Sequence, residues 1–339
     1  MPNQRKLRIL IVSDAWAPQI NGVVVTLRHT IRELGCAGHE VATLTPEGFR
    51  TIPCPTYPEI ALSLFPGKRV TATIEAFAPD ALHIATEGPL GLAARAHCLR
   101  TQRPFTTAYH TQFPEYVHAR TRLPLGVSYR WMRWFHAPSK CLMVATDHIR
   151  RRLADRGFGN LAMWTRGVDT DLFRPGPRAS PEVKRPIFLY AGRVAIEKNI
   201  EAFLALDLPG TKWVVGDGPA RAELQRRFPN ATFFGMRVGE DLAWHYRQAD
   251  VFVFPSRTDT FGLVMLEAMA SGTPVAAFPV TGPIDVVRDG ESGVLDEDLR
   301  RAALSALDLS RDRVRAHAEQ SSWQQATAQF LANLHPVHA

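Results

Sequence analysis

The sequence predicts an α/β protein made of two consecutive domains, each with a parallel β-sheet between layers of helices. Short and nearly continuous apolar segments alternate with segments of helical pattern along the chain, and strands of this kind are typical of parallel sheets. The chain has 339 residues, which is enough for two hydrophobic cores. A proline-rich connector, residues 174–186, separates the two series of segments.

The first series opens with Leu7–Ser13, an apolar segment too short for a signal-peptide core and followed at once by Asp14. We expect this segment to form a buried first strand. Further strands are expected at Glu40–Leu44, Ala81–Ile84, Phe105–Tyr109 and Cys141–Ala145, with helices at Val23–Leu34 and Pro89–Leu99.

The second series predicts strands at Ile187–Ala191, Thr211–Val215, Thr232–Phe234, Asp250–Phe254 and Pro274–Ala277, and the tail 298–334 has a helical pattern. We divide the chain into a domain 1–172, a linker 173–186, a domain 187–315 and a C-terminal helix 316–339, for which we allow a return to the first domain. Ligands of open parallel sheets bind beyond the carboxyl ends of the strands. Two such sheets facing each other would therefore hold a ligand in a deep cleft between them.

Composition and charge narrow the class of protein. Hydrophobic residues make up 45% and charged residues 22%, which is ordinary for a soluble globular protein. No apolar run approaches the roughly 18 residues that span a bilayer. The four cysteines (Cys36, Cys54, Cys98 and Cys141) have no metal-binding or redox spacing, so we expect a reduced, cytoplasmic setting.

Positive charge is concentrated in the first half. Residues 1–170 contain 21 Lys and Arg against 12 Asp and Glu, a net charge of +9, and the remainder carries −2. This asymmetry indicates an anionic partner for the first half. No nucleic-acid-binding motif occurs, so we expect an anionic membrane surface, with the protein peripheral on the inner face of the cell membrane.

One segment of the first half combines aromatic and basic residues. On a helix over Val127–His136, the side chains of Val127, Trp131, Trp134 and Phe135 share a face, with Arg130 and Arg133 beside them and Arg120 and Arg122 just before. This combination suits a membrane interface. Packing of the same aromatic residues inside the domain explains the pattern equally well.

The stretch from Gly192 to Gly272 contains the main binding candidates. Phe261-Gly262-Leu263 begins a helix, and the free N–H groups at a helix start attract an anion. Alone, this feature is equally typical of a tight turn before a core helix. Arg193 and Lys198 follow a buried strand directly and can reach the same anion, a diphosphate in particular.

Two carboxylates complete this set. Glu267 lies eight residues after Asp259, and a carboxylate can accept hydrogen bonds from a ribose diol or from sugar hydroxyls. Two cations, two carboxylates and a glycine-led helix start together suit a nucleotide sugar.

Other signals are weaker. Gly216 lies in Gly-Asp-Gly-Pro, which is also a common strand-ending turn. Gly22 lies in Asn21-Gly22-Val23, which follows the first strand and can offer backbone N–H groups to an anion, although an ordinary strand-to-helix turn has the same pattern. His110 follows a predicted strand and can point into the cleft, although a lone histidine is more often structural. Asp169-Thr-Asp171 resembles a metal-binding pair, but a cation there would duplicate Arg193 and Lys198, so we expect no metal and no cofactor.

Over essentially its whole length the chain resembles retaining glycosyltransferases of family 4, which have the GT-B architecture of two Rossmann-like domains. The resemblance is carried, in order, by Gly192–Asn199, Gly216–Pro219, Asp250–Ser256 and Asp259–Gly272. Tyr109–Thr111, Arg133–His136 and Arg166–Pro175 resemble a narrower group of bacterial α-mannosyltransferases and sulfoquinovosyl- or glucosyl-diacylglycerol synthases.

The resemblance implies a role for several of these positions. Arg193 and Lys198 would bind the donor diphosphate, Glu267 the ribose, and Asp259 the donor sugar. Asp259 stands where the first glutamate of the Glu-x7-Glu motif of the family is usual, and Asn21-Gly22 stands where two glycines are common.

Further roles follow from the same resemblance. The amides of Gly262 and Leu263, after Phe261, would cap a phosphate, and Gly216 would line the donor site. His110 would contact the sugar near the reacting carbon, and Gly22 would allow the diphosphate close to the first domain. Selection of the base would depend on the backbone around Gly235.

The implied activity is transfer of a hexose from a UDP- or GDP-linked sugar to a hydroxyl acceptor, with retention at the anomeric carbon. The expected acceptor is a membrane lipid such as diacylglycerol, bound on the side of the N-terminal domain. One alternative is a GDP-mannose-dependent α-mannosyltransferase acting on a glycolipid or polysaccharide precursor. Another, of a different class, is a non-catalytic nucleotide-sugar-binding protein.

Overall fold

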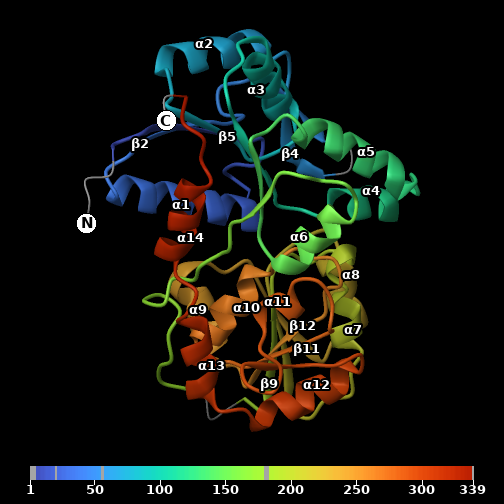
Figure 1. The fold of residues 1–339 in the computed structure, drawn as a ribbon. Coiled ribbons are helices and arrows are strands. Elements are labelled where there is room, and N and C mark those ends of the chain that lie inside the picture. The colour runs from blue at the N-terminus through green and yellow to red at the C-terminus, as the bar shows by residue number, and fades with distance from the viewer. Residues whose placement is uncertain (1–4, 20, 55–56, 179–182, 338–339) are drawn as a thin grey trace. The chain divides into compact units, whose positions relative to one another are not determined.

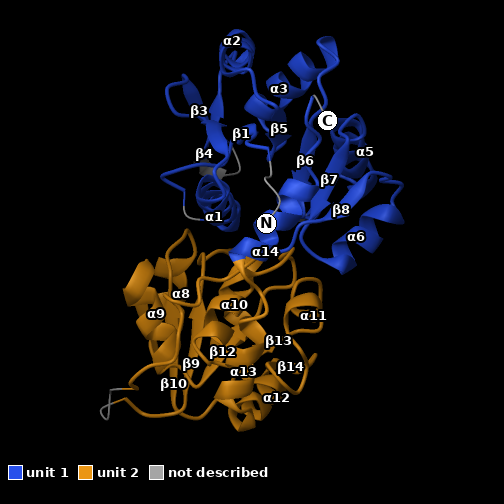
Figure 2. Ribbon diagram, turned by 60° about the vertical axis from the view of Figure 1, so that its left-hand side comes forward, with its two compact units in different colours: residues 1–165, 323–339 blue, residues 166–322 orange. Residues whose placement is uncertain are grey.

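The computed structural model describes residues 5–19, 21–54, 57–178 and 183–337, without the side chains of residues 57–59, 119 and 120. The chain forms two compact units (Figure 2). Unit 1 comprises residues 1–165 and 323–339, and unit 2 comprises residues 166–322.

Unit 1 is built on a six-stranded parallel sheet in the order β2-β1-β5-β6-β7-β8. Its strands are β1 (Arg8–Val12), β2 (Glu40–Leu44), β5 (Ala81–Ile84), β6 (Thr106–Tyr109), β7 (Cys141–Val144) and β8 (Leu161–Met163). Its helices are α1 (Gly22–Cys36), α2 (Gly67–Phe77), α3 (Pro89–Arg100), α4 (Phe113–Thr121), α5 (Leu125–His136), α6 (Asp147–Ala154) and α14 (Trp323–Ala332).

The side chains of β1 alternate between two hydrophobic clusters, which explains why helices cover both faces of the sheet. Ile9 and Ile11 pack in one cluster with residues of α1 and α14, whereas Leu10 and Val12 pack in another with residues of α2, α3 and α5. Successive side chains of a strand point to opposite faces. An apolar strand buried on both sides therefore requires helices on both faces of the sheet.

A buried carboxylate fixes the start of α3. Asp14 follows β1 and accepts hydrogen bonds from the backbone N–H groups of Leu90 and Gly91 and from the hydroxyl of Thr86, at 2.8, 3.3 and 2.9 Å. Burial raises the pKa of Asp14 to about 6, against the lowering effect of these hydrogen bonds. The loop after β1 is thus tied to the loop after β5.

An antiparallel hairpin lies outside the main sheet of unit 1. It consists of β3 (Thr51–Cys54) and β4 (Tyr57–Ser63), which pair with each other in a separate two-stranded sheet. The hairpin leads through Leu64, Phe65 and Pro66 into α2.

Unit 2 has a second six-stranded parallel sheet, in the order β11-β10-β9-β12-β13-β14. Its strands are β9 (Ile187–Ala191), β10 (Thr211–Val215), β11 (Ala231–Gly235), β12 (Val251–Phe254), β13 (Val275–Ala277) and β14 (Gly293–Leu295). Its helices are η1 (Ile196–Lys198), α7 (Ile200–Leu204), α8 (Arg221–Arg227), α9 (Gly239–Gln248), α10 (Leu263–Ala270), α11 (Pro283–Val286), α12 (Leu299–Ser305), η2 (Ala306–Asp308) and α13 (Arg311–Ala318).

The predicted fold class of two parallel α/β units is confirmed. Three features were not anticipated: the hairpin, and the edge strands β8 and β14. The tail is helical as expected, but in several segments rather than one helix. Its last helix, α14, belongs to unit 1 and lies beside α1 (Figure 1), with the rings of Trp323 and His29 stacked at 4.5 Å.

The limits of the compact units differ by several residues from the domain limits expected from the sequence. The chain passes from unit 1 to unit 2 between residues 165 and 166, and it returns between residues 322 and 323. The expected limits were residue 172 at the first boundary and residue 316 at the second.

Candidate functional site

The site candidates of unit 2 meet at one edge of its sheet. Strands β11, β10, β9 and β12 are neighbours in that order, and all four are parallel. Their carboxyl ends lead into residues 192–199, 216–220 and 255–262 and into the turn at Gly235. The candidate residues on or after these strands are therefore carried by one edge of the sheet: Arg193, Lys198, Gly216, Gly235, Asp259, Phe261, Gly262, Leu263 and Glu267.

Glycines allow two of these loops to pack backbone against backbone. A Cβ on Gly216 would lie 1.9 Å from the carbonyl oxygen of Gly192, and one on Gly218 would lie 2.4 Å from that of Val194. The N–H of Val194 donates to the carbonyl of Asp217 at 2.8 Å. Gly216 is thus more than a residue of an ordinary turn, because any side chain at this position would separate the two loops.

Lys198 and Asp259 form an ion pair with 2.5 Å between Nζ and Oδ1, and both side chains are largely buried. Two further contacts tie their loops together. The side-chain amide of Asn199 donates to the carbonyl of Pro255 at 3.0 Å, and the hydroxyl of Thr258 donates to the carbonyl of Glu197 at 3.3 Å. The ammonium group and the carboxylate are therefore held together at the end of β9 and β12.

Helix α10 starts at a glycine in the left-handed region. Gly262 has φ +86°, and a Cβ there would lie 2.7 Å from Cε of Met265 and 3.1 Å from the ring of Phe254. The N-cap residue of α10 is Gly262, which has no side chain to cap the helix start. The first N–H groups of α10, beginning with that of Leu263, are thus available to an anion.

Glu267 lies one turn further along α10 and has a partner that the sequence did not indicate. The hydroxyl of Tyr246, in α9, donates to Oε2 of Glu267 at 2.9 Å. Burial raises the pKa of Glu267 to about 7, and the hydrogen bond from Tyr246 lowers it in part. No local motif marks Tyr246, because its role depends on how α9 packs beside α10.

Two predicted residues belong to unit 1. His110 directly follows β6, and its ring lies edge-on to that of Trp164 at 5.5 Å between centroids. Gly22 is the first residue of α1, where Oδ1 of Asn21 accepts the N–H groups of Val23 and Val24, each at 3.0 Å. Two of the N–H groups that we expected to face an anion are therefore bonded to Asn21.

Helix α5 contains the predicted aromatic and basic face, but only some of its apolar side chains are exposed. Phe135 is fully buried, and Trp131 stacks on it at 5.9 Å between centroids. Val127 and Trp134, by contrast, are 55% and 52% exposed. Phe135 therefore packs inside the unit, whereas Val127 and Trp134 are part of an exposed apolar surface. The side chain of Arg120 lies outside the described part of the chain.

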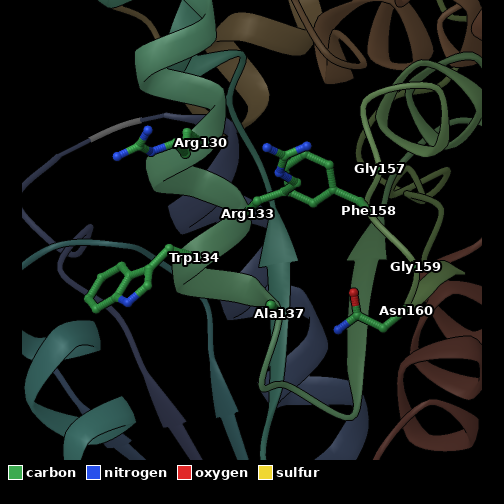
Figure 3. Close-up of a pocket in the computed structure, with 8 residues that line it drawn as sticks. All are labelled: Arg130, Arg133, Trp134, Ala137, Gly157, Phe158, Gly159 and Asn160. Carbon is green, nitrogen blue, oxygen red and sulfur yellow. The ribbon is translucent and has the colours of Figure 1, made fainter.

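A hollow of about 430 Å³ lies between α5 and the segment before β8 (Figure 3). It is lined by Arg130, Arg133, Trp134, Ala137, Gly157, Phe158, Gly159 and Asn160. Arg133 points toward Phe158 and donates to the carbonyl of Arg156 at 2.9 Å. Arg133 therefore has a structural partner, whereas Arg130 points away to the other side of the helix.

The suspected metal-binding pair has a local structural role. Oδ1 of Asp169 accepts hydrogen bonds from the N–H groups of Asp171 and Leu172 at 3.2 and 3.1 Å, as in an Asx turn.

Among the residues that the structure describes, none of the helices has the length and apolar character of a membrane-spanning segment.

Comparison with known proteins identifies the family. The model for glycosyltransferase family 4 matches residues 20–172, and the model for glycosyl transferases group 1 matches residues 185–312. The GDP-mannose-dependent alpha-mannosyltransferase of Mycolicibacterium smegmatis is 31% identical, with 88% of this chain and 87% of that protein aligned. The alpha-monoglucosyldiacylglycerol synthase of Streptococcus pneumoniae is 28% identical over 90% of this chain and 79% of that protein.

Solved structures show the same fold. Sucrose-phosphate synthase from Thermosynechococcus elongatus superimposes with a TM-score of 0.78 at 22% identity, covering 97% of this chain and 98% of the other. The fold, the loops at the carboxyl edge of the sheet of unit 2 and the similar proteins all point to the same family. The chain is therefore a glycosyltransferase and belongs to glycosyltransferase family 4.

Proposed function

We propose that this enzyme transfers a hexose from a UDP- or GDP-linked sugar to a hydroxyl group of a membrane lipid such as diacylglycerol, with retention at the anomeric carbon. One observation carries the proposal. Lys198, Asp259, the open start of α10 and Glu267 gather at the carboxyl edge of one parallel sheet, where such sheets bind their ligands.

In this proposal the diphosphate of the donor is bound by the cations and the helix start. Charge on the leaving diphosphate grows as the glycosidic bond breaks, and Arg193, Lys198 and the amides of Gly262 and Leu263 would stabilise it. One such contact is typically worth about 3 kcal/mol in the transition state. A phosphate oxygen of the donor would take the acceptor's proton, so no protein group is proposed as the base.

The remaining donor contacts are proposed by position. Asp259 would bind the sugar hydroxyls and Glu267 the ribose, with Phe261, Gly216 and Gly235 lining the site. In unit 1, His110 would contact the sugar near the reacting carbon, and Gly22 would leave room for the diphosphate. We propose that the reaction uses no metal and no cofactor, because fixed cations and helix N–H groups supply the positive charge.

A membrane-bound acceptor is supported by the surface of unit 1. Val127 and Trp134 are exposed on α5 beside Arg130, and residues 1–170 carry the net charge of +9. The streptococcal relative is named as a synthase of a glucosylated diacylglycerol. We propose peripheral association with the cytoplasmic face of the membrane, with unit 1 as the acceptor-side domain.

The relative from Mycolicibacterium smegmatis favours a second candidate, a GDP-mannose-dependent α-mannosyltransferase acting on a glycolipid or polysaccharide precursor. A non-catalytic nucleotide-sugar-binding protein is disfavoured, because Arg193, Lys198, Asp259 and Glu267 are all present.

Two measurements test the proposal. A thermal-shift screen across UDP- and GDP-sugars identifies the donor, because a ligand that binds only the folded state raises Tm. The stabilising donor, labelled in the sugar, is then incubated with vesicles containing diacylglycerol, and the anomeric configuration of the product is read by NMR. Labelled lipid with the donor's configuration supports the proposal. Transfer only to water-soluble glycans would reject the lipid acceptor, and an inverted product would reject retention.

A further inference from the structure

The turn between the hairpin and α2 holds an aromatic side chain in solvent. Phe65 is 95% exposed and has φ +48°, in the left-handed region. A bulky residue with positive φ is an outlier, since this backbone conformation favours glycine or asparagine. Pro66 follows directly, and a proline further restricts the residue before it.

The surrounding structure fixes this turn. The N–H of Leu64 donates to the carbonyl of Arg50 at 2.8 Å, and the N–H of Val70 donates to that of Pro66 at 2.9 Å. Arg69 donates to the carbonyl of Gly48 and lies over the ring of Phe49, 4.6 Å from its centroid. A strained, exposed aromatic residue held in this way suggests a function outside the fold itself.

Apolar and basic groups together surround Phe65. Leu64 and Ile52 are 38% and 46% exposed. A hollow of about 360 Å³ opens beside them, lined by Gly48, Phe49, Arg50, Leu64, Phe65 and Arg69. Arg50 lines the hollow and is exposed, and Lys68 is exposed in the first turn of α2. The acidic residues nearby in the sequence are Glu47 and Glu59. The surface thus combines apolar side chains at its centre with a net positive rim.

We propose that the 48–69 surface, defined by Gly48–Ile52 and Leu64–Arg69, docks this enzyme on an anionic lipid bilayer, with Phe65 inserted among the acyl chains. An anionic bilayer offers an apolar interior beneath a negatively charged surface, which matches both parts of this surface. Arg50 and Lys68 contact the lipid phosphates. The inference deepens the proposed lipid acceptor and rests on it, but vesicle binding is measured without any donor.

The main test is a substitution that suits the backbone but not the membrane. Asparagine tolerates the left-handed conformation, so Phe65→Asn should keep or raise Tm while weakening binding to vesicles of phosphatidylcholine and phosphatidylglycerol. The expected loss is roughly ten- to hundredfold, from the burial of one Phe side chain. Phe65→Trp should keep binding. Leu307→Asn, at an exposed apolar residue of unit 2, is the matched control and should bind like the parent.

Charge is tested separately. The double variant Arg50→Gln with Lys68→Gln should bind roughly thirtyfold more weakly, since each basic residue near an anionic surface contributes about fivefold. Binding of the parent should fall with salt, and binding of the double variant should depend less on it. Arg69 is left unchanged because it supports the turn.

Co-sedimentation with anionic and with neutral vesicles, and turnover on a short soluble acceptor, distinguish the outcomes. Loss of anionic-vesicle binding by Phe65→Asn, with its turnover kept, supports the inference. Equal binding of Phe65→Asn and the parent overturns it, as does a parent that binds no vesicles.

Other results would assign this surface a different role. Loss of turnover of Phe65→Asn on the soluble acceptor would make Phe65 part of the acceptor site. Self-association that Phe65→Asn abolishes would make this surface an interface between copies. If the parent binds anionic vesicles but transfers no sugar, the proposed function fails and the docking surface stands.

Discussion

At the scale of single residues, the ion pair between Lys198 and Asp259 decides how unit 2 presents positive charge. The pair is 2.5 Å long and largely buried, so the ammonium group is fixed rather than moving on a long flexible side chain. A donor diphosphate would share Lys198 with Asp259. The carboxylate therefore positions the cation, and the sugar hydroxyls would lie beside it.

We expect Lys198→Ala to keep the fold and to lower transfer by roughly a hundredfold or more, the usual effect of removing one contact to the developing charge. Circular dichroism and a turnover assay with the identified donor measure both. Arg226→Ala, at an exposed cation of α8, is the control and should match the parent. Activity of Lys198→Ala within a few-fold of the parent would contradict the diphosphate role.

The raised pKa of Glu267 predicts pH-dependent donor binding. Its pKa of about 7 in the free protein means that the side chain is mostly protonated at pH 6 and mostly ionised at pH 8. If the ribose diol donates to the carboxylate, Kd for the nucleoside diphosphate should be about tenfold higher at pH 6 than at pH 8. Titration calorimetry with the parent and with Glu267→Gln measures this. The variant corrects for ionisation of the phosphate, and an equal pH dependence in both proteins would exclude a ribose role.

The raised pKa of Glu267 also predicts that donor binding and the stability of the fold depend on pH in opposite directions. Its folded pKa of about 7 exceeds the unfolded value of about 4.3, so the folded state binds more protons between these values. The free energy of unfolding falls as pH rises through this window, and most of the loss has occurred once the pH has passed through the folded pKa of about 7. Glu267→Gln should therefore unfold at a higher temperature than the parent at pH 8, by roughly 2–3 kcal/mol in stability, while it binds the donor more weakly. A lower Tm at pH 8 would contradict the buried, raised carboxyl group.

At the scale of elements, the loops after β9 and β10 act as one structure. Gly216 and Gly218 allow the backbone of one loop to contact the backbone of the other, and the N–H of Gly216 also donates to the carbonyl of Gly235 at 2.8 Å. Three neighbouring strand ends are thus joined. This rigid edge would let the donor site form without rearrangement of its backbone.

Substitution of Gly216 should therefore disrupt the contact between the loops that follow β9 and β10. A Cβ at 1.9 Å from the carbonyl oxygen of Gly192 cannot be accommodated, so Gly216→Ala should destabilise unit 2 by roughly 3 kcal/mol or more. Gly239→Ala is the matched control, because Gly239 also has positive φ but has no atom within 4 Å of the added Cβ. Its cost should be about 1 kcal/mol. Thermal unfolding compares the two variants, and equal losses would mean that backbone conformation, not loop contact, requires the glycine.

At the scale of the whole molecule, the end of the chain completes the core of the first unit. Phe330 of α14 is fully buried, and its ring lies 5.0 Å from that of His83 and 4.8 Å from that of Trp164. The chain thus leaves unit 1, forms unit 2 and returns. The stability of unit 1 depends on residues beyond unit 2 in the sequence.

Phe330→Ala should destabilise unit 1 by about 3–5 kcal/mol, as expected for removal of a buried aromatic ring. Limited proteolysis with mass spectrometry should show earlier cleavage within residues 1–165, while the donor-induced thermal shift of unit 2 is kept. Gln324→Ala, on the exposed side of α14, should behave like the parent. Equal susceptibility of both units in Phe330→Ala would mean that they unfold as one.

The sequence by itself determined the inner strands of both sheets and the loops that follow them, but not the hairpin or the edge strands β8 and β14. An apolar strand such as Ile187–Ala191 is recognisable because burial on both faces requires a local run of apolar residues. The loops that carry Lys198 and Asp259 follow such runs at short distances, and parallel strands bring their carboxyl ends to one edge. The fold class, and the candidate residues that gather at this edge, could therefore be read along the chain.

Only the tertiary structure decided which distant residues meet. It pairs Tyr246 with Glu267, joins Phe330 to the core of unit 1, and buries Phe135 while leaving Trp134 exposed on the same helix. It also holds Phe65 in a strained turn in solvent. The local pattern does not reveal these contacts, because each depends on packing between elements that are separate in sequence. Local periodicity determines which elements form, whereas the contacts between them determine which side chains are buried, paired or presented.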